Sequence, residues 1–331
     1  MTPRRFLLLT AGIALVTLVL APLFGAQPLD WRALFHASEG DPAPLLFWQV
    51  RVPRVATGFL AGAALAVVGA AFQALFRNPL ATPFTLGVSS AASLGAALHV
   101  RLGLAFPFFG LPDVCLTSFL AGLGAILLVY GLTRLRGGFS TARLLLAGVA
   151  ASFLFSSLIM VVHYTTDAYD AFRLLRRLMG SLSASGTDTL WGLVPITLLG
   201  AIYLASLSWE LDLLALGEEL ALSRGVDGQG IRRRLFFATC LMESAVVALC
   251  GPIGFVGLMV PHICRLMIGN THRFLLPASF LVGGTFLTIC DTMARTLFAP
   301  AEMPVGVITS LLGGPFFLWL LLGPRSHELE V

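Results

Sequence analysis

Residues 55–76 read VATGFLAGAALAVVGAAFQALF, an uncharged run in which Gly58, Gly62, Ala66 and Ala70 recur at every fourth position. The run is close to the length of about 20 residues that a helix needs to cross the hydrocarbon core of a membrane. Residues four apart lie on one face of a helix, and small side chains there let a second helix approach closely. The pattern predicts a membrane-spanning helix at the centre of a helical bundle.

The composition extends this prediction to the whole chain of 331 residues. Hydrophobic residues make up 57% of the chain and charged residues only 11%. Such a balance is typical of a protein that crosses the membrane several times, because charged side chains are costly in the hydrocarbon core. We therefore expect an all-α polytopic membrane protein in which residues 1–331 form a single transmembrane domain.

Comparable apolar runs indicate about ten crossings. They lie at residues 6–23, 80–100, 114–132, 144–166, 189–209, 274–290 and 305–323, in addition to 55–76. Residues 6–23 exceed the apolar core of roughly 7 to 15 residues found in cleaved signal peptides, which favours an uncleaved first span. Residues 235–267 would reach about 50 Å as one helix, so we expect two crossings hinged at Gly251-Pro252-Ile253-Gly254.

The arginines orient these crossings. With Arg4 and Arg5 inside, ten spans place Arg265, Arg273 and Arg325 in the cytoplasm and Arg295 outside, as the positive-inside rule prefers. We therefore expect a multi-pass protein of the cell inner (cytoplasmic) membrane, with both termini cytoplasmic. Eight arginines remain external in this topology, at positions 32, 51, 54, 101, 173, 176, 177 and 295.

Residues 211–234, LDLLALGEELALSRGVDGQGIRRR, form the one long polar interruption of the chain. Leucines at helical spacing on both sides of Gly217 predict two short helices joined by this glycine and ended by Gly225. Connections in helical bundles usually take about 2 to 8 residues, and longer ones tend to carry function. We expect this segment to lie in the cytoplasm and to be contacted by another protein.

Several classes of function are excluded. All 21 basic residues are arginine, so the chain lacks the lysine of a phosphate-binding Walker A loop, and any ATP hydrolysis must come from another chain. The five cysteines have no CxxC spacing, and His99, His163 and His262 stand alone, so we expect neither a metal site nor catalytic residues. The net charge of +4 arises from loop arginines and gives no reason to expect a nucleic-acid partner.

Two features leave alternatives open. Glu243 lies well inside a predicted span, where a carboxylate serves either a helix–helix hydrogen bond or a proton or cation. Arg173, Arg176 and Arg177 recur at helical spacing in an external segment, which favours a solvated helix at the membrane surface without defining what it contacts.

A series of motifs, in order along about 270 residues, resembles one family of transporters. The motifs are RVPR at 51–54, GAAL at 62–65, RNPL at 77–80 with LGVSS at 86–90, GPIGFVGLMVPH at 251–262, DTMAR at 291–295, and PVGVIT at 304–309 with GPFFLW at 314–319. Together they are similar to the permease subunits of binding-protein-dependent ABC importers for iron-siderophores, haem and vitamin B12, the FecCD-type family.

The resemblance implies a homodimeric type II ABC importer permease fold in the lipid bilayer. Two copies of an ABC ATPase would bind this chain on its cytoplasmic side, and a periplasmic or lipoprotein substrate-binding protein would dock on the outside. ATP and Mg would be bound by the ATPase, so this chain itself would need no cofactor. The cargo would be an iron complex, either a siderophore or haem, with vitamin B12 as the alternative. The metal would travel inside its chelate.

The resemblance also assigns residues. ATPase coupling falls to residues in the segment 211–234, namely Gly217, Glu218, Glu219, Arg224 and Gly225. The cytoplasmic gate or translocation path involves Asn78, Leu80 and Thr141, and docking of the binding protein involves Arg51, Arg54 and Arg295. Guanidinium groups suit docking because they hold carboxylates with two hydrogen bonds, although such arginines also bind lipid phosphates or cap spans.

Two other classes of protein fit the sequence less well. An ion-coupled secondary transporter needs ion ligands near the midplane and internal repeats, whereas this chain has only Glu243 and no evident repeat. A membrane enzyme needs a catalytic nucleophile or a cluster of metal ligands, and the sequence indicates neither.

Overall fold

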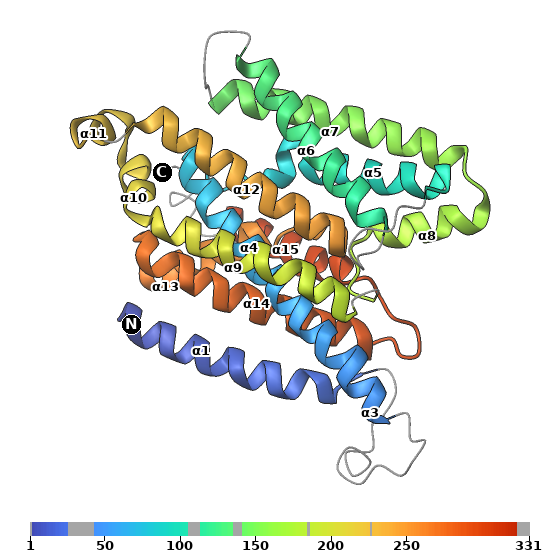
Figure 1. Ribbon diagram of the computed structural model, residues 1–331. Coiled ribbons are helices and arrows are strands. Elements are labelled where there is room, and N and C mark those ends of the chain that lie inside the picture. Colours follow the sequence, from blue (N-terminus) through green and yellow to red (C-terminus); the bar gives the residue numbers. More distant parts are fainter. Residues whose placement is uncertain are drawn as a thin grey trace.

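The computed structural model describes residues 2–25, 43–104, 113–134, 141–183, 186–225 and 227–322, and every regular element within them is a helix (Figure 1). The first half comprises α1 (Pro3–Leu20), η1 (Ala21–Leu23), α3 (Ala43–Leu45), η2 (Leu46–Arg51), α4 (Val52–Phe76), η3 (Pro83–Leu86), α5 (Val88–Leu102), α6 (Asp113–Arg134) and α7 (Thr141–Tyr164). The second half comprises α8 (Ala168–Leu178), α9 (Thr187–Ser206), α10 (Ser208–Leu216), α11 (Glu218–Ser223), α12 (Gly228–Cys250), α13 (Val256–Ile268), α14 (His272–Thr296) and α15 (Val305–Leu322).

The all-α prediction is confirmed, and a helix occupies each of the ten predicted crossings. Among the described residues, six helices are long and apolar enough to span a membrane, and Val256–Ile268 and Val305–Leu320 are shorter apolar helices. The break at 251–254 is also present, since α12 ends at Cys250 and Gly251 takes a left-handed φ of 74°. Two arginines of the topology argument, Arg32 and Arg325, lie outside the described residues.

The small-residue face of α4 lies at the centre of the bundle, as predicted. Nearly every residue of α4 is buried, and the helix crosses α14 and α13 in close backbone contact. A Cβ atom on Gly62 would overlap the backbone oxygen of Gly283, and one on Gly69 would overlap that of Gly257. Glycine is therefore required at these crossings because any larger residue would separate the helices.

The prediction of one continuous crossing over residues 80–100 was wrong at its start. A 3₁₀ turn, η3, occupies Pro83–Leu86, and α5 begins only at Val88 after Gly87, whose φ is 79°. Pro79 and Pro83 disfavour a helical conformation in the residues that precede them, and the left-handed glycine ends the turn. The third crossing is thus a short helix preceded by a compact turn.

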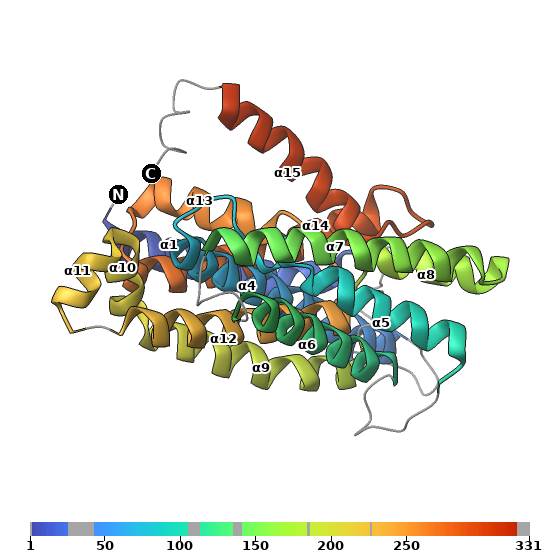
Figure 2. The same cartoon turned by 90° about the horizontal axis from the view of Figure 1, so that it is seen from above.

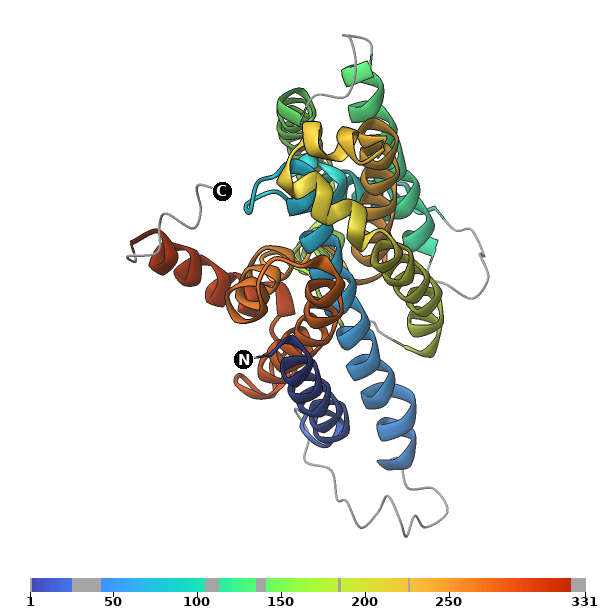
Figure 3. The ribbon, with the colours of Figure 1, turned by 90° about the vertical axis from the view of Figure 1, so that its left-hand side faces the viewer.

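The bundle has two distinct ends. The first residues of α1 lie at the same end as α10 and α11, whereas α3 and α8 lie at the opposite end (Figure 1). Seen from above and from the side, α15 leans away from the other helices (Figures 2 and 3). The end with α10 and α11 is called the coupling end below, and the opposite end is called the outer end.

The close contact of α4 with α13 generates a prediction about folding. Gly69→Val places branched carbon atoms against the backbone of Gly257, so we expect at least a fivefold loss of monodisperse protein after detergent extraction. Gly131→Val in α6 is the matched control, because no atom lies within 4 Å of the position that its Cβ would occupy. Equal yields of the two variants, measured by size-exclusion chromatography, would contradict the packing argument.

Candidate functional site

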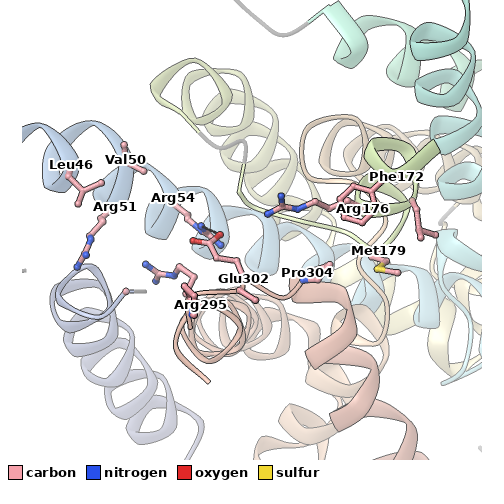
Figure 4. Close-up of a pocket in the computed structure, with 14 residues that line it drawn as sticks. Leu46, Val50, Arg51, Arg54, Phe172, Arg176, Met179, Arg295, Glu302 and Pro304 are labelled. Atoms are coloured by element: carbon pink, nitrogen blue, oxygen red, sulfur yellow. Dashed lines mark hydrogen bonds and ion pairs between the residues drawn. The ribbon is translucent and has the colours of Figure 1, made fainter. Parts of the chain in front are cut away.

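A pocket of 720 Å³ opens at the outer end and is lined by charged side chains (Figure 4). Its walls come from η2, α4, α8, α14 and the loop before α15. The three arginines predicted for docking, Arg51, Arg54 and Arg295, all line this pocket, together with Arg176 and Glu302. The fold thus brings together residues that are more than 200 positions apart in the sequence.

Asp291 of α14 joins two of these arginines. Its carboxylate accepts hydrogen bonds from Nε and Nη2 of Arg54, with Nη2 at 3.0 Å from Oδ1, and it lies 3.0 Å from Nε of Arg295. All three side chains are at most 8% exposed. Removing one partner of such a buried ion pair costs about 3–5 kcal/mol, because the other charge stays buried without compensation.

The other guanidinium N–H groups of the three arginines donate hydrogen bonds to Glu302 and to backbone oxygens at the end of the first span. Arg54 also donates to Glu302, at 2.9 Å, and the Glu302 side chain is 28% exposed at the mouth of the pocket. Arg51 donates to the backbone oxygens of Pro22 and Leu23 at the end of η1, both at 3.3 Å. Arg295 donates to the backbone oxygen of Phe24 at 3.1 Å. These bonds fix the end of the first span against α4 and α14.

The three arginines assigned to docking thus line one pocket at the outer end. We expected Arg51, Arg54 and Arg295 at the external ends of spans, where a partner could contact them, and within this chain all three are buried and hydrogen-bonded. The i,i+4 spacing of Asp291 and Arg295 was visible in the sequence, but the partnership of Arg54 with Asp291 joins residues 237 positions apart. Their contact with a docking protein stays a prediction.

The external arginine helix is α8, and its three arginines face different surroundings. Arg173 is 61% exposed and pairs with Asp170 at 3.3 Å. Arg177 donates to the backbone oxygen of Ala248 in α12 at 2.6 Å, and Arg176 lines the outer pocket. Arg173 and Arg176 are exposed and match the expectation of a solvated helix, whereas Arg177 is half-buried and anchors α8 to the bundle.

At the coupling end, the predicted pair of short helices is present as α10 and α11. Gly217 between them has a φ of 144°, and Gly225 after α11 has a φ of 75°. Residues other than glycine rarely adopt these φ angles, which explains why glycine stands at both positions. Glu218 and Glu219 are the first two residues of α11, and the structure does not describe their side chains. Arg224 is exposed.

Two hydrogen-bonded links tie α10 to long helices of the bundle. Asp212 Oδ1 accepts from the backbone N–H of His272 at 2.8 Å and lies 2.6 Å from its Nδ1, which joins α10 to the start of α14. Arg77, at the left-handed end of α4, donates from Nε to the backbone oxygen of Leu214 at 3.0 Å. Neither link was predicted, because the partners are far apart in the sequence.

The predicted gate residues lie near this end. Asn78 Oδ1 accepts from the backbone N–H of Leu80 at 2.9 Å, which closes a tight turn directly after α4, and Leu80 is 49% exposed. Thr141 is the first residue of α7, and its side chain lies outside the description. Nothing in these contacts tests a gating function, which stays a prediction.

A second pocket, of 630 Å³, lies among the helices, is partly open to the outside and is called the inner pocket. It is bordered by α4, η3, α12, the 251–254 break and α15, and its lining is mostly apolar. Glu243 lines it and also accepts a hydrogen bond from Oγ of Ser89 at 3.1 Å. Met179 lines both the inner and the outer pocket, so the two spaces adjoin.

Within the described ranges, no group of three or more His, Cys, Asp or Glu residues is placed to hold a metal ion. The five cysteines are buried and unpaired.

A helical bundle with apolar spans, a partly open pocket among its helices and polar structures at both ends is typical of a membrane transport protein. A family model described as the FecCD transport family matches residues 13–323, and the chain belongs to this family of ABC importer permeases. The haemin transport system permease HmuU of Yersinia pestis is 41% identical over 97% of both chains. The vitamin B12 import system permease BtuC of Klebsiella pneumoniae is 40% identical, over 98% of this chain and 95% of that one.

Solved structures agree with this placement. A metal-chelate type ABC transporter in an inward-facing conformation matches with a TM-score of 0.85 and 32% identity, over 96% of this chain and 99% of that one. The PsaBC protein of Streptococcus pneumoniae, in complex with an antibody fragment, matches with a TM-score of 0.59, 18% identity and coverage of 85% and 94%, and supports the fold alone. The chain is a multi-pass permease subunit of an ABC importer.

The link between α10 and α14 gives a prediction. Asp212→Ala removes the acceptor for His272, so we expect at least a threefold loss of transport per ATP hydrolysed in the reconstituted importer. Asp227→Ala is the matched control, because Asp227 caps only its own helix, accepting from Gly230 N–H at 3.0 Å. Uptake and ATP hydrolysis are measured in the same proteoliposomes. An unchanged ratio for Asp212→Ala would remove this link from the coupling pathway.

Proposed function

We propose that the chain forms the membrane channel of an importer that carries an iron complex, either a siderophore or haem, across the inner membrane. The observation that carries this proposal is the similarity over nearly the whole chain to a haemin permease and to a vitamin B12 permease. Import of vitamin B12 or a related corrinoid is the alternative. Both cargoes are bulky chelates, and a pocket of 630 Å³ with few charged groups suits such molecules better than bare ions.

The energy source in this proposal is a separate ATPase bound at the coupling end. The absence of lysine supports it, because the chain has no Walker A loop of its own. Leu216 and Leu222, on either side of Gly217, are 71% and 61% exposed, and exposed apolar side chains of this kind favour a protein contact. In this proposal, Gly217, Glu218, Glu219, Arg224 and Gly225 sit in a groove of the ATPase.

A second copy of this chain completes the channel. α7 is strongly apolar, yet only 11% of the residues in its apolar stretch are buried within this chain. α15 leans away from its own bundle (Figure 2). Two copies with these helices between them enclose a path along a two-fold axis. The positive-inside rule supports a cytoplasmic coupling end, with Arg77, Arg224 and Arg232–Arg234 at that end.

The test of the function is reconstitution. The purified chain alone should hydrolyse no ATP, whereas proteoliposomes with its ATPase and binding protein should import the chelate in an ATP-dependent manner. Glu219→Arg reverses a charge in the proposed ATPase groove and should reduce both ATPase binding and uptake at least tenfold, whereas Glu210→Arg, at the first turn of α10, should not. Hydrolysis by the chain alone, or normal binding by Glu219→Arg, would contradict the proposal.

At the outer end, Arg54 is the arginine that a carboxylate of a docking protein could bind in place of Glu302. Among the described residues, the partially exposed Glu302 is the one partner of Arg54 at the pocket mouth, and Asp291 lies beneath it. We propose that an acidic residue of the binding protein replaces Glu302 at this guanidinium and that Arg51 and Arg295 contribute positive charge around it. Arg54→Glu and Arg295→Glu are poor probes, because each would leave Asp291 buried beside a like charge.

Glu302→Gln is the sharper probe. It removes the charge that competes for Arg54, so we expect a threefold or greater gain in affinity for the binding protein. Arg51→Gln, which removes a positive charge but keeps a donor for the backbone oxygens of Pro22 and Leu23, should cause a similar loss. Both effects should shrink at high salt, since the Debye length falls from about 10 Å at 0.1 M to about 3 Å at 1 M. Arg173→Glu, which reverses an exposed charge away from the pocket lining, is the control. Affinity is measured by surface plasmon resonance, and docking by these arginines is excluded if neither variant differs from the control.

A further inference from the structure

Two arginines at the coupling end belong to neighbouring helices that an aromatic contact joins. Tyr130 of α6 and Phe237 of α12 pack ring against ring, with centroids 5.1 Å apart. Arg134 follows Tyr130 by one helical turn and Arg233 precedes Phe237 by one turn, so each arginine shares a helix face with its ring. Because α6 ends and α12 begins at the coupling end, the ring contact brings Arg134 and Arg233 to one surface there (Figure 1). They are called the arginine pair below.

The arginine pair has no anionic partner within the part of the chain that the structure describes. Both side chains are exposed, as is that of Arg234, and none of the three takes part in an ion pair among these residues. The one carboxylate of α6, Asp113, lies at the other end of that helix. Asp227, before α12, accepts from the backbone N–H of Gly230. Adjacent positive charges without a counter-charge repel each other, so this surface favours an anion.

The arginine pair also lies where the bundle leaves the hydrocarbon core of the membrane. α6 has 22 residues and carries charge only at its two ends, and at 1.5 Å per residue it spans about 33 Å. The hydrocarbon core is about 30 Å thick, so Arg134 lies at its boundary. On α12, the residues between Arg234 and Glu243 are uncharged. Tyr130 suits the same level, since tyrosine is enriched where membrane and water meet.

An apolar surface continues from the two rings into the membrane. Leu127 of α6 is 55% exposed and Leu241 of α12 is 42% exposed, and each lies one turn beyond the ring of its own helix. Outward leucines at this depth contact lipid acyl chains. α15 lies on the opposite side of the bundle from α6 and α12 (Figures 2 and 3), so a second copy packed on α15 leaves this surface to lipid.

We propose that the arginine pair binds the phosphate of an anionic phospholipid, whose acyl chains lie along Leu127 and Leu241. Guanidinium groups hold phosphate oxygens with paired hydrogen bonds, and basic sites between membrane helices bind anionic headgroups. The bound lipid neutralises the repulsion within the pair and joins the ends of α6 and α12. Its leaflet is the cytoplasmic one, which rests on the orientation in the proposed function, whereas the binding itself depends on neither cargo nor ATPase.

The test compares two phospholipids with the same acyl chains, anionic phosphatidylglycerol and zwitterionic phosphatidylcholine. Native mass spectrometry of the full chain, purified in detergent, measures the affinity for each, and the unaltered chain should prefer phosphatidylglycerol at least fivefold. Arg134→Gln with Arg233→Gln should reduce this preference at least fivefold, because each arginine near an anionic headgroup contributes a factor of roughly five. Arg134→Lys with Arg233→Lys keeps both charges and should retain at least half of the preference.

The matched control removes two arginines from another helix at the same end. Arg4 and Arg5 at the start of α1 are both exposed, and Arg4→Gln with Arg5→Gln should change the preference less than twofold. An equal loss in this control would show that the total charge decides, and it would overturn the site. Excess inorganic phosphate, which lacks acyl chains, should not displace phosphatidylglycerol, and displacement would overturn the assignment to a lipid.

The remaining outcomes also decide. No preference in the unaltered chain, or an unchanged preference in the glutamine variant with a normal size-exclusion profile, overturns the inference. If that variant keeps the preference but loses the ATPase in a pull-down, the arginine pair belongs to a protein contact instead. The binding measurement uses neither cargo nor ATPase, so it can fail while the proposed function stands, and absence of uptake in the reconstituted importer leaves it unaffected.

Discussion

The close backbone contact of α4 with α13 and α14 is the constraint on which the rest of the structure depends. Membrane helices gain little from the hydrophobic effect between one another, so their association relies on tight packing and on polar contacts. At Gly62 and Gly69 the neighbouring backbones lie where a Cβ atom would be. This approach lets α4 run through the middle of the bundle, and it brings groups on α13 and α14 within hydrogen-bonding distance of α4.

The polar groups inside the bundle follow from that approach. Gln73 donates to the backbone oxygen of Gly257 at 3.2 Å, one turn from the Gly69 contact, and accepts from Arg265. Arg54 reaches Asp291 on the same α4–α14 surface. Buried charges are tolerated because each has a partner with suitable geometry. Glu243 has the hydroxyl of Ser89 instead of a cation beside it.

The sequence predicted the parts of this structure that depend on local pattern. The small-residue face of residues 55–76 indicated the central helix, Gly251 and Pro252 indicated the break between α12 and α13, and Gly217 indicated two short helices at the coupling end. The sequence did not predict contacts between residues that lie far apart in the chain. The burial of Arg54 follows from Asp291, and the attachment of α10 follows from His272, so no local pattern could have revealed either. The late start of α5 was within reach, since Pro79, Pro83 and Gly87 signalled a turn.

The two ends of the permease share the same pair of helices. α4 carries Arg54 near its outer end and Arg77 at the coupling end, and α14 carries Asp291 near its outer end and His272 at its start. Each helix has 25 residues, which at 1.5 Å per residue spans about 37 Å. Because Gly62 and Gly283 hold the two helices in backbone contact, neither can slide or tilt far without the other. We therefore expect a shift of α10, which contacts α4 through the backbone of Leu214 and α14 through Asp212, to move both helices and the Arg54–Asp291 pair as one unit.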